Sequence, residues 1–146
     1  MGQWTSETES AFDRWFSSLG PYKQAVLSAA IENVLEVYGM DICSMEWGKN
    51  LGGGLYEFRI RQSLHAVMTF GNVDSAKAKP GEDQTVLLRV FITFHGEKVV
   101  LLMSGYDKGK DNSDKRQNKE IAKARSLLTS WKAARLAAAK ADRKSQ

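Results

Sequence analysis

The chain has 146 residues, of which 42% are hydrophobic and 26% charged, enough apolar sequence for one domain with its own core. No apolar run approaches the roughly 20 residues of a membrane span, and the polar start MGQWTSETES lacks the basic and apolar regions of a secretory signal. Cys43 is the only cysteine, which excludes an internal disulfide, and no Cys/His set has metal-site spacing. We therefore expect a cytoplasmic protein that needs no metal or other cofactor.

Positive charge is concentrated at the C-terminal end. Residues 106–146 carry 12 Lys and Arg against 5 Asp and Glu, whereas the rest of the chain carries 9 against 12. A basic segment of this kind either binds a polyanion such as a nucleic acid or forms a solvated helix surface.

The N-terminal part predicts two helices. Residues 6–18 have aromatic side chains at helical spacing, and Ser6 with Glu9 has the pattern of a capping box. Gly20-Pro21 ends this helix and suits the start of a second one, which runs to about residue 38. The following residues, 40–54, have no regular pattern.

Strands are predicted in the middle of the chain, where residues 55–62 alternate with the period of two that is typical of strands. LYEFRIRQ (55–62) places Glu57, Arg59 and Arg61 on the face opposite its apolar side chains. HAVMTF (65–70) is a candidate second strand, followed by a mobile loop over residues 71–83. TVLLRVFITF (85–94), with Arg89 at its middle, and KVVLLMSGY (98–106) are predicted strands joined by a turn at residues 95–97.

A last helix is predicted from about Asp114, and its apolar stripe ends at Trp131. The predicted fold is therefore α+β, with an N-terminal helical hairpin packed on an antiparallel sheet and a C-terminal helix. We expect one domain over residues 1–131 and a basic extension over residues 132–146 that is a fraying helix or disordered. Helices on one sheet face would leave the other partly open, and the strand arginines are expected to form a positive groove there.

Three segments, in this order, resemble the RelE/HigB/ParE toxin superfamily and are most similar to its phage-derived, HigB-like branch: LGGGLYEFRIR, LLRVFITFHGEKVVLLMSGYDKGKD and KRQNKEIAKAR. The resemblance covers about residues 8–131. The segment 63–84 is longer than the family's link, and the tail is extra. The resemblance implies the RelE-like microbial ribonuclease fold.

The resemblance also implies a function and partners. It implies the toxin of a type II toxin–antitoxin system, a metal-independent endoribonuclease that cuts mRNA, usually on the ribosome. The implied partner is a cognate antitoxin, often of helix-turn-helix type, which blocks the toxin and brings the complex to operator DNA. Two alternatives stay open: a ParE-like toxin that inhibits DNA gyrase by binding, and an inactive nucleic-acid-binding relative.

Cutting RNA without a metal uses the neighbouring 2′-OH as nucleophile, so it needs a base and cations that stabilise charge on the phosphate. We expect Arg59, Arg61 and Arg89 to bind and stabilise the phosphate, and Tyr106 to stack on a base or orient the 2′-OH. Further cations are expected to hold the RNA: Lys108, Lys110, Lys115, Arg116 and Lys119.

The sequence leaves the general base open. His65 and His95 have a suitable intrinsic pKa, although a histidine in a turn is more often a solvated surface residue. Glu57 shares the face of the arginines, where it is either a base or their salt-bridge partner.

Overall fold

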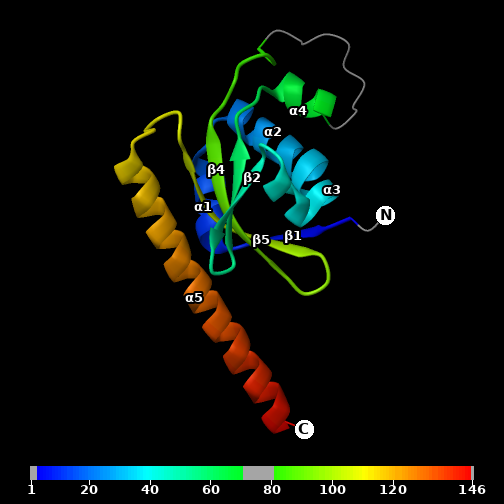
Figure 1. Cartoon of the computed structure of the whole chain (residues 1–146), viewed down its shortest axis with the longest axis vertical. Coiled ribbons are helices and arrows are strands. Elements are labelled where there is room, and N and C mark those ends of the chain that lie inside the picture. The colour runs from blue at the N-terminus through cyan, green and yellow to red at the C-terminus, as the bar shows by residue number, and fades with distance from the viewer. Residues whose placement is uncertain (1–2, 71–80, 146) are drawn as a thin grey trace.

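The centre of the molecule is a five-stranded sheet in the order β1-β5-β4-β3-β2, shown in Figure 1. The structure is a computed structural model that describes residues 3–70 and 81–145. Neighbouring strands are antiparallel except at one edge, where β1 runs parallel to β5. The strands are β1 (Thr5–Thr8), β2 (Gly48–Gly52), β3 (Leu55–Ile60), β4 (Leu88–His95) and β5 (Val99–Asp107).

Helices cover both faces of this sheet, so the α+β class is confirmed (Figure 1). On one face lies the N-terminal helical layer, and α5 crosses the other. The helices are α1 (Ser10–Ser18), α2 (Pro21–Ala30) with a π-helical turn (Ile31–Leu35), α3 (Glu36–Tyr38), a 3-10 helix (Gly39–Ser44), α4 (Leu64–Phe70) and α5 (Asp114–Ser145).

Strand alternation divides the apolar side chains into two cores. Phe58 and Ile60 of β3 pack in the larger core with the N-terminal helices. Leu55, the first residue of β3, faces the opposite side and packs with Leu128 of α5. We expected helices on only one sheet face, which would leave the other face open. Instead, α5 covers part of that second face.

The first predicted helix begins too early. Residues 5–8 form β1, whose backbone pairs with the edge of β5, and α1 starts only at Ser10. The predicted capping box is wrong because Ser6 lies in the strand, where its hydroxyl donates to Glu36 at 2.6 Å. Glu9 precedes α1 without a side-chain capping bond. The sheet is consequently mixed rather than wholly antiparallel.

The segment 40–54, expected to be irregular, contains the 3-10 helix and the edge strand β2. The glycines at 52, 53 and 54 form the β2–β3 turn, and all three have positive φ angles (87°, 66° and 85°), which other residues adopt only with strain. The carbonyls of this turn accept hydrogen bonds from Arg125 and Lys132 of α5. The turn therefore fastens α5 to the sheet.

HAVMTF is a helix, α4, and the prediction of a strand there is wrong. The Ser63 hydroxyl caps this helix by accepting from the Ala66 N–H at 3.1 Å. Both neighbours of β3 in the sheet are other strands, β2 and β4, so the segment cannot pair beside β3. The predicted mobile loop falls largely on residues 71–80, which lie outside the described residues.

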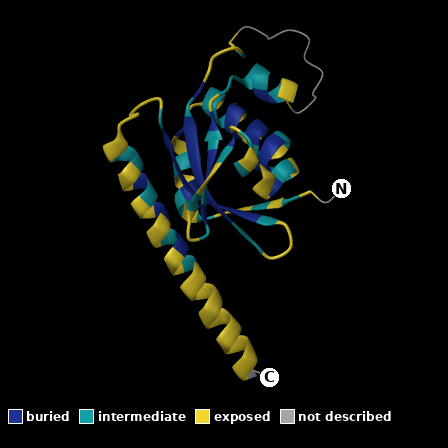
Figure 2. Cartoon of the chain, in the orientation of Figure 1, coloured by how far each residue is buried: buried dark blue, intermediate teal, exposed yellow. Residues whose placement is uncertain are grey.

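The C-terminal extension is helical, since α5 continues through residue 131 to Ser145 without a break. Figure 2 shows that its second half is exposed on all sides where it projects beyond the sheet. Within residues 3–70 and 81–145, no helix combines the length and the apolar composition needed to cross a bilayer.

Close packing of α1 on β5 gives a test of this architecture. A Cβ added at Gly105 would lie 2.3 Å from the indole ring of Trp15, whereas one at Gly20 meets nothing within 4 Å. We expect Gly105→Ala to lower the free energy of unfolding by about 1–3 kcal/mol through overpacking. Gly20→Ala, the matched control, should change it by less than about 1 kcal/mol. Urea unfolding of both variants measures this, and equal stabilities would contradict the described packing of α1.

Candidate functional site

Three of the predicted site residues form one row across the sheet. The register places Arg59 of β3 opposite Arg89 of β4, and Arg89 opposite Tyr106 of β5. Opposite residues in an antiparallel pair have Cα atoms only about 4.5–5.5 Å apart. The sequence placed these side chains on one face, and the strand pairing brings them together at one end of it.

Two members of this row are buried together with two neighbouring polar side chains, and we call these four residues the buried polar layer: Glu57, Arg89, Ser104 and Tyr106. Glu57 is fully buried, and its Oε1 accepts from Nε of Arg59 at 2.6 Å and lies 3.7 Å from Nε of Arg89. Glu57 is therefore the salt-bridge partner of two arginines, one of the two roles expected for it.

The buried polar layer has unused hydrogen-bonding capacity. Among the described residues, four of its atoms have no hydrogen-bond partner: Glu57 Oε2, Arg89 Nε, Ser104 Oγ and Tyr106 Oη. Buried polar groups are nearly always paired, so four such atoms in one cluster need an explanation. A substrate that contributes polar atoms at this place would supply one.

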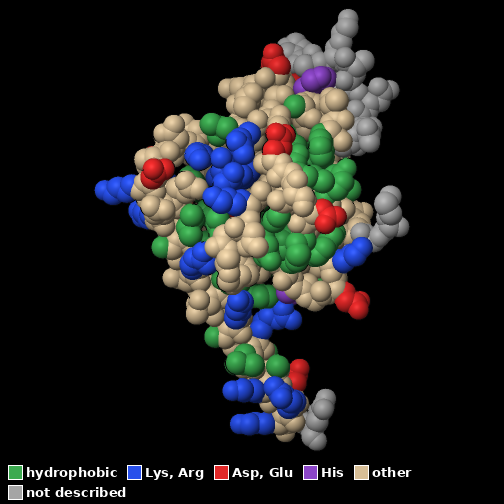
Figure 3. All heavy atoms as spheres, in the orientation of Figure 1, with side chains coloured by type: hydrophobic (Ala, Val, Ile, Leu, Met, Phe, Trp, Pro, Cys, Tyr) green, Lys and Arg blue, Asp and Glu red, His purple; other side chains and the backbone are tan. Residues whose placement is uncertain are grey.

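Above the buried polar layer lie side chains that solvent reaches, which we call the cationic rim: Arg59, Arg61, Lys108 and Arg116. Arg59 is 21% exposed and Arg116 37% exposed, so both can reach a bound ligand while Arg89 and Tyr106 lie beneath them. Figure 3 shows Lys and Arg side chains gathered on this face, beside the start of α5. The predicted groove therefore has two layers.

Arg116 covers the phenol of Tyr106. Its guanidinium lies 5.5 Å from the centre of the ring, and its Nε donates to Glu120 at 3.0 Å. The Ser113 hydroxyl accepts from the backbone N–H of Arg116 and so caps α5 at this point. Tyr106 is only 1% exposed, and Arg116 is one of the side chains that cover its ring.

The surroundings shift three pKa values in the site. Burial lowers the pKa of Arg89, with Glu57 opposing this shift, but a guanidinium keeps its proton in proteins. Burial, and then the charge of Arg89, lower the pKa of Lys108. Burial, and then the charge of Glu57, raise the pKa of Tyr106. Lys108 therefore loses its proton more readily than an ordinary lysine, whereas Tyr106 holds its proton more firmly.

The structure does not bring the two histidines close to the row of Arg59, Arg89 and Tyr106. His65 lies on α4, and Leu64 and Val67 of the same helix pack in the core on the other sheet face. His65 therefore does not continue the strand of Arg61 and does not share its face. His95 ends β4, six residues from Arg89, which is about 20 Å of extended strand. Its ring nitrogens lie 3.0 Å from Glu7 and 2.8 Å from Arg135.

The remaining predicted cations lie outside the cationic rim. Lys110 lines a pocket beside the junction of α1 and α2, and Lys115 and Lys119 are exposed on the first turns of α5. Ser104 was not singled out from the sequence, although it is the only hydroxyl in the apolar run VVLLMSG and could have been found by that contrast. Ser104 lies opposite Phe91 of β4, which places it on the same sheet face as Arg89 and Tyr106.

Comparison with known proteins adds no relative, because no family model, curated protein or solved structure matches the chain. The part of the chain that the structure describes contains no group of three His, Cys, Asp or Glu side chains placed to hold a metal ion. The site is therefore judged on its geometry and charge.

Proposed function

We propose that the chain is the toxin of a type II toxin–antitoxin pair in the RelE/HigB/ParE superfamily, a metal-independent endoribonuclease that cuts mRNA. The observation that carries the proposal is the row of Arg59, Arg89 and Tyr106 with its unpaired polar atoms, lying under a cationic rim. A phosphodiester fits such a place, since it brings negative charge and several acceptor oxygens.

The arginines of the rim bind and polarise the scissile phosphate. Arg59 is held by Glu57 through Nε, so its terminal nitrogens are directed away from that bond and remain available as donors. Arg61 is exposed just past the end of β3, and its charge acts on Arg89. Arg89 adds fixed positive charge from below, where low polarity strengthens its effect on charge that develops on the phosphate.

Lys108 is the proposed proton acceptor. It directly follows β5 and lies close enough to Arg89, Glu57 and Arg59 for their charges to act on its amine. Burial, and then the charge of Arg89, lower its pKa, which makes the neutral amine more accessible. The amine takes the proton of the 2′-OH, the 2′-oxygen bonds to phosphorus, and the bond from phosphorus to the 5′-oxygen breaks. The departing 5′-oxygen takes a proton from solvent water and the Lys108 ammonium returns its proton to the solvent, which leaves a 2′,3′-cyclic phosphate and a 5′-OH.

Glu57 positions the arginines in this mechanism and does not act as the base. Its side chain is completely buried, and one of its oxygens is already bonded to Arg59. A general base has to reach the proton that it removes. Lys108 on the rim meets that condition.

The same proposal includes the partners. We expect ribosome-bound mRNA as the substrate, action in the cytoplasm, and a cognate antitoxin that covers the cationic rim and alone brings the complex to operator DNA. The positive charge of residues 106–146 supports a polyanionic or acidic partner for this side of the molecule.

Purified protein incubated with end-labelled RNA in EDTA, with and without ribosomes, tests the proposed chemistry. We expect cleavage in EDTA and products that end in a 2′,3′-cyclic phosphate, because the neighbouring hydroxyl is the nucleophile. Products with a 3′-OH, or a requirement for added divalent cation in the chemical step, would contradict the mechanism. Intact RNA together with blocked DNA supercoiling would favour the ParE-like alternative.

A further inference from the structure

A second candidate binding place lies at the junction of α1 and α2, which we call the junction groove. It consists of two cavities, of about 210 and 190 Å³, that share Leu19 and Lys110. Val86, just before β4, and Asp107, at the end of β5, also line it. The junction groove therefore lies at the same end of the sheet as the row of Arg59, Arg89 and Tyr106.

The floor of the junction groove is apolar and fixed in place. Leu19 and Val86 are 8% and 4% exposed, and the ring of Tyr22 stands beside them. The Tyr22 hydroxyl donates to the carbonyl of Gln84 at 2.7 Å and accepts from the backbone N–H of Leu64 at 3.1 Å. A flat, apolar group such as a nucleic-acid base can lie on this floor without rearranging it.

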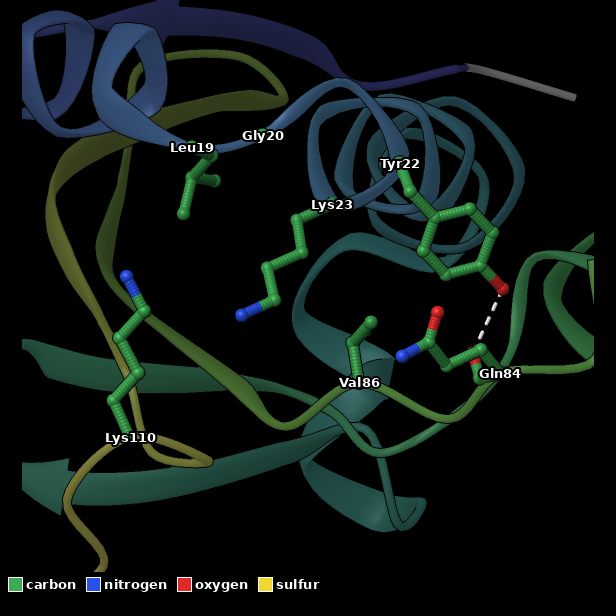
Figure 4. Close-up of a pocket in the computed structure, with 7 residues that line it drawn as sticks. All are labelled: Leu19, Gly20, Tyr22, Lys23, Gln84, Val86 and Lys110. Carbon is green, nitrogen blue, oxygen red and sulfur yellow. Dashed lines mark hydrogen bonds between the residues drawn. The ribbon is translucent and has the colours of Figure 1, made fainter. Parts of the chain in front are cut away.

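The rim of the junction groove is positive. Figure 4 shows the amine of Lys110 directed toward Leu19 and the amine of Lys23 directed into the space between Lys110 and Val86. Arg116 lines the adjoining cavity, and Asp107, which pairs with Lys23, is the one carboxylate in the lining. Lys23 is paired with Asp107 and Arg116 with Glu120, so among the described residues Lys110 supplies the positive charge of the lining that no salt bridge offsets.

The start of α2 adds to this field. Gly20 precedes the helix without a side-chain capping bond, Pro21 occupies the first turn, and no acidic residue lies in that turn. The positive end of the helix dipole is therefore uncompensated where Gly20 and Tyr22 line the groove.

The junction groove is continuous with the candidate active site. Lys108 belongs to the cationic rim and Lys110 to the groove, and their Cα atoms are at most about 7 Å apart along the chain. Arg116 takes part in both, since it covers Tyr106 and also lines the second cavity. A strand bound at the cationic rim can thus pass directly into the groove.

We propose that the junction groove binds a nucleotide of single-stranded RNA one step beyond the pair that flanks the scissile phosphate, a role that rests on the proposed function. Its base lies on the floor formed by Leu19, Val86 and Tyr22. Its phosphate lies between Lys23 and Lys110.

Fluorescence anisotropy with labelled 2′-O-methyl RNA, which lacks the attacking hydroxyl and cannot be cut, measures binding without cleavage. The probes are a dinucleotide, which fills only the cationic rim, and a pentanucleotide, which also reaches the groove. The variant is Lys110→Glu, at an exposed side chain. The matched control is Lys123→Glu, at an exposed position on α5 away from both places.

We expect Lys110→Glu to weaken pentanucleotide binding about tenfold, the loss of one charge-assisted contact, and to lower the salt dependence by about one unit of slope. Dinucleotide binding should change little, and Lys123→Glu should affect neither probe. Equal losses for both probes, or equal losses in both variants, would overturn the junction groove as a subsite. If wild type cuts no RNA but Lys110→Glu still weakens only the pentanucleotide, the nuclease proposal fails while the groove is retained as an RNA-binding site.

Discussion

Replacing Glu57 by Gln is expected to lower the free energy of unfolding by about 3–5 kcal/mol, the cost of leaving a buried charge without its partner. Glu57 is completely buried, and Arg89 beside it is only 3% exposed. The substitution keeps the shape of the side chain and removes its charge, so the guanidinium of Arg89 stays buried without a carboxylate. Urea unfolding followed by circular dichroism measures the loss.

A control and a compensated variant show whether the charge is the cause. Glu120→Gln removes a carboxylate whose partner Arg116 is partly exposed, and it should cost about 1 kcal/mol or less. Glu57→Leu combined with Arg89→Met replaces the buried pair by apolar groups and should recover most of the stability. A loss in Glu57→Gln no larger than that in Glu120→Gln would contradict the described pairing.

Replacing Lys108 by Arg is expected to lower kcat for RNA cleavage by about 10²–10⁴-fold, the usual contribution of a general acid or base. Arginine keeps the positive charge but does not lose its proton in proteins. The variant therefore separates proton transfer from phosphate binding, and KM should change much less than kcat. Lys123→Arg, at an exposed position on α5, is the matched control and should behave as wild type.

The pH dependence follows from the direction of the pKa shift at Lys108. The neutral amine is the active form, so the rate should rise with pH and level off once Lys108 is deprotonated. Because burial and Arg89 lower the pKa of Lys108, the levelling should come below the ordinary pKa of lysine, about 10.4. Single-turnover rates across pH measure this. A rising limb that persists unchanged in Lys108→Arg would remove Lys108 from the role of base.

Period-two alternation in the sequence predicted β3, whereas β4 and β5 were predicted as apolar runs on either side of a turn. The same alternation predicted that Glu57, Arg59 and Arg61 share a face, and the structure confirms that Arg59 and Glu57 are in contact there. The C-terminal helix was also predicted, since its apolar stripe repeats over several turns.

Other features of the fold depend on tertiary contacts, so the local sequence pattern did not predict them. β1 and β2 are short and polar, and they become strands by pairing with the edges of β5 and β3. α4 has the apolar composition of a strand but cannot pair beside β3. Arg89 was expected on an open face, yet it is buried. Arg89 is buried because neighbouring strands lie on both sides of it and α5 lies across that sheet face. The sequence around Arg89 does not show these contacts.

The most direct test of the central claim is primer extension on cellular mRNA after brief induction of the protein. Wild type is compared with Arg59→Ala/Lys108→Arg, which removes a phosphate-binding group and the proposed base while leaving Glu57 and Arg89 in place. We expect strong cuts within codons in wild type and none in the double variant. Growth arrest with intact mRNA, or equal cutting by the double variant, would contradict the account.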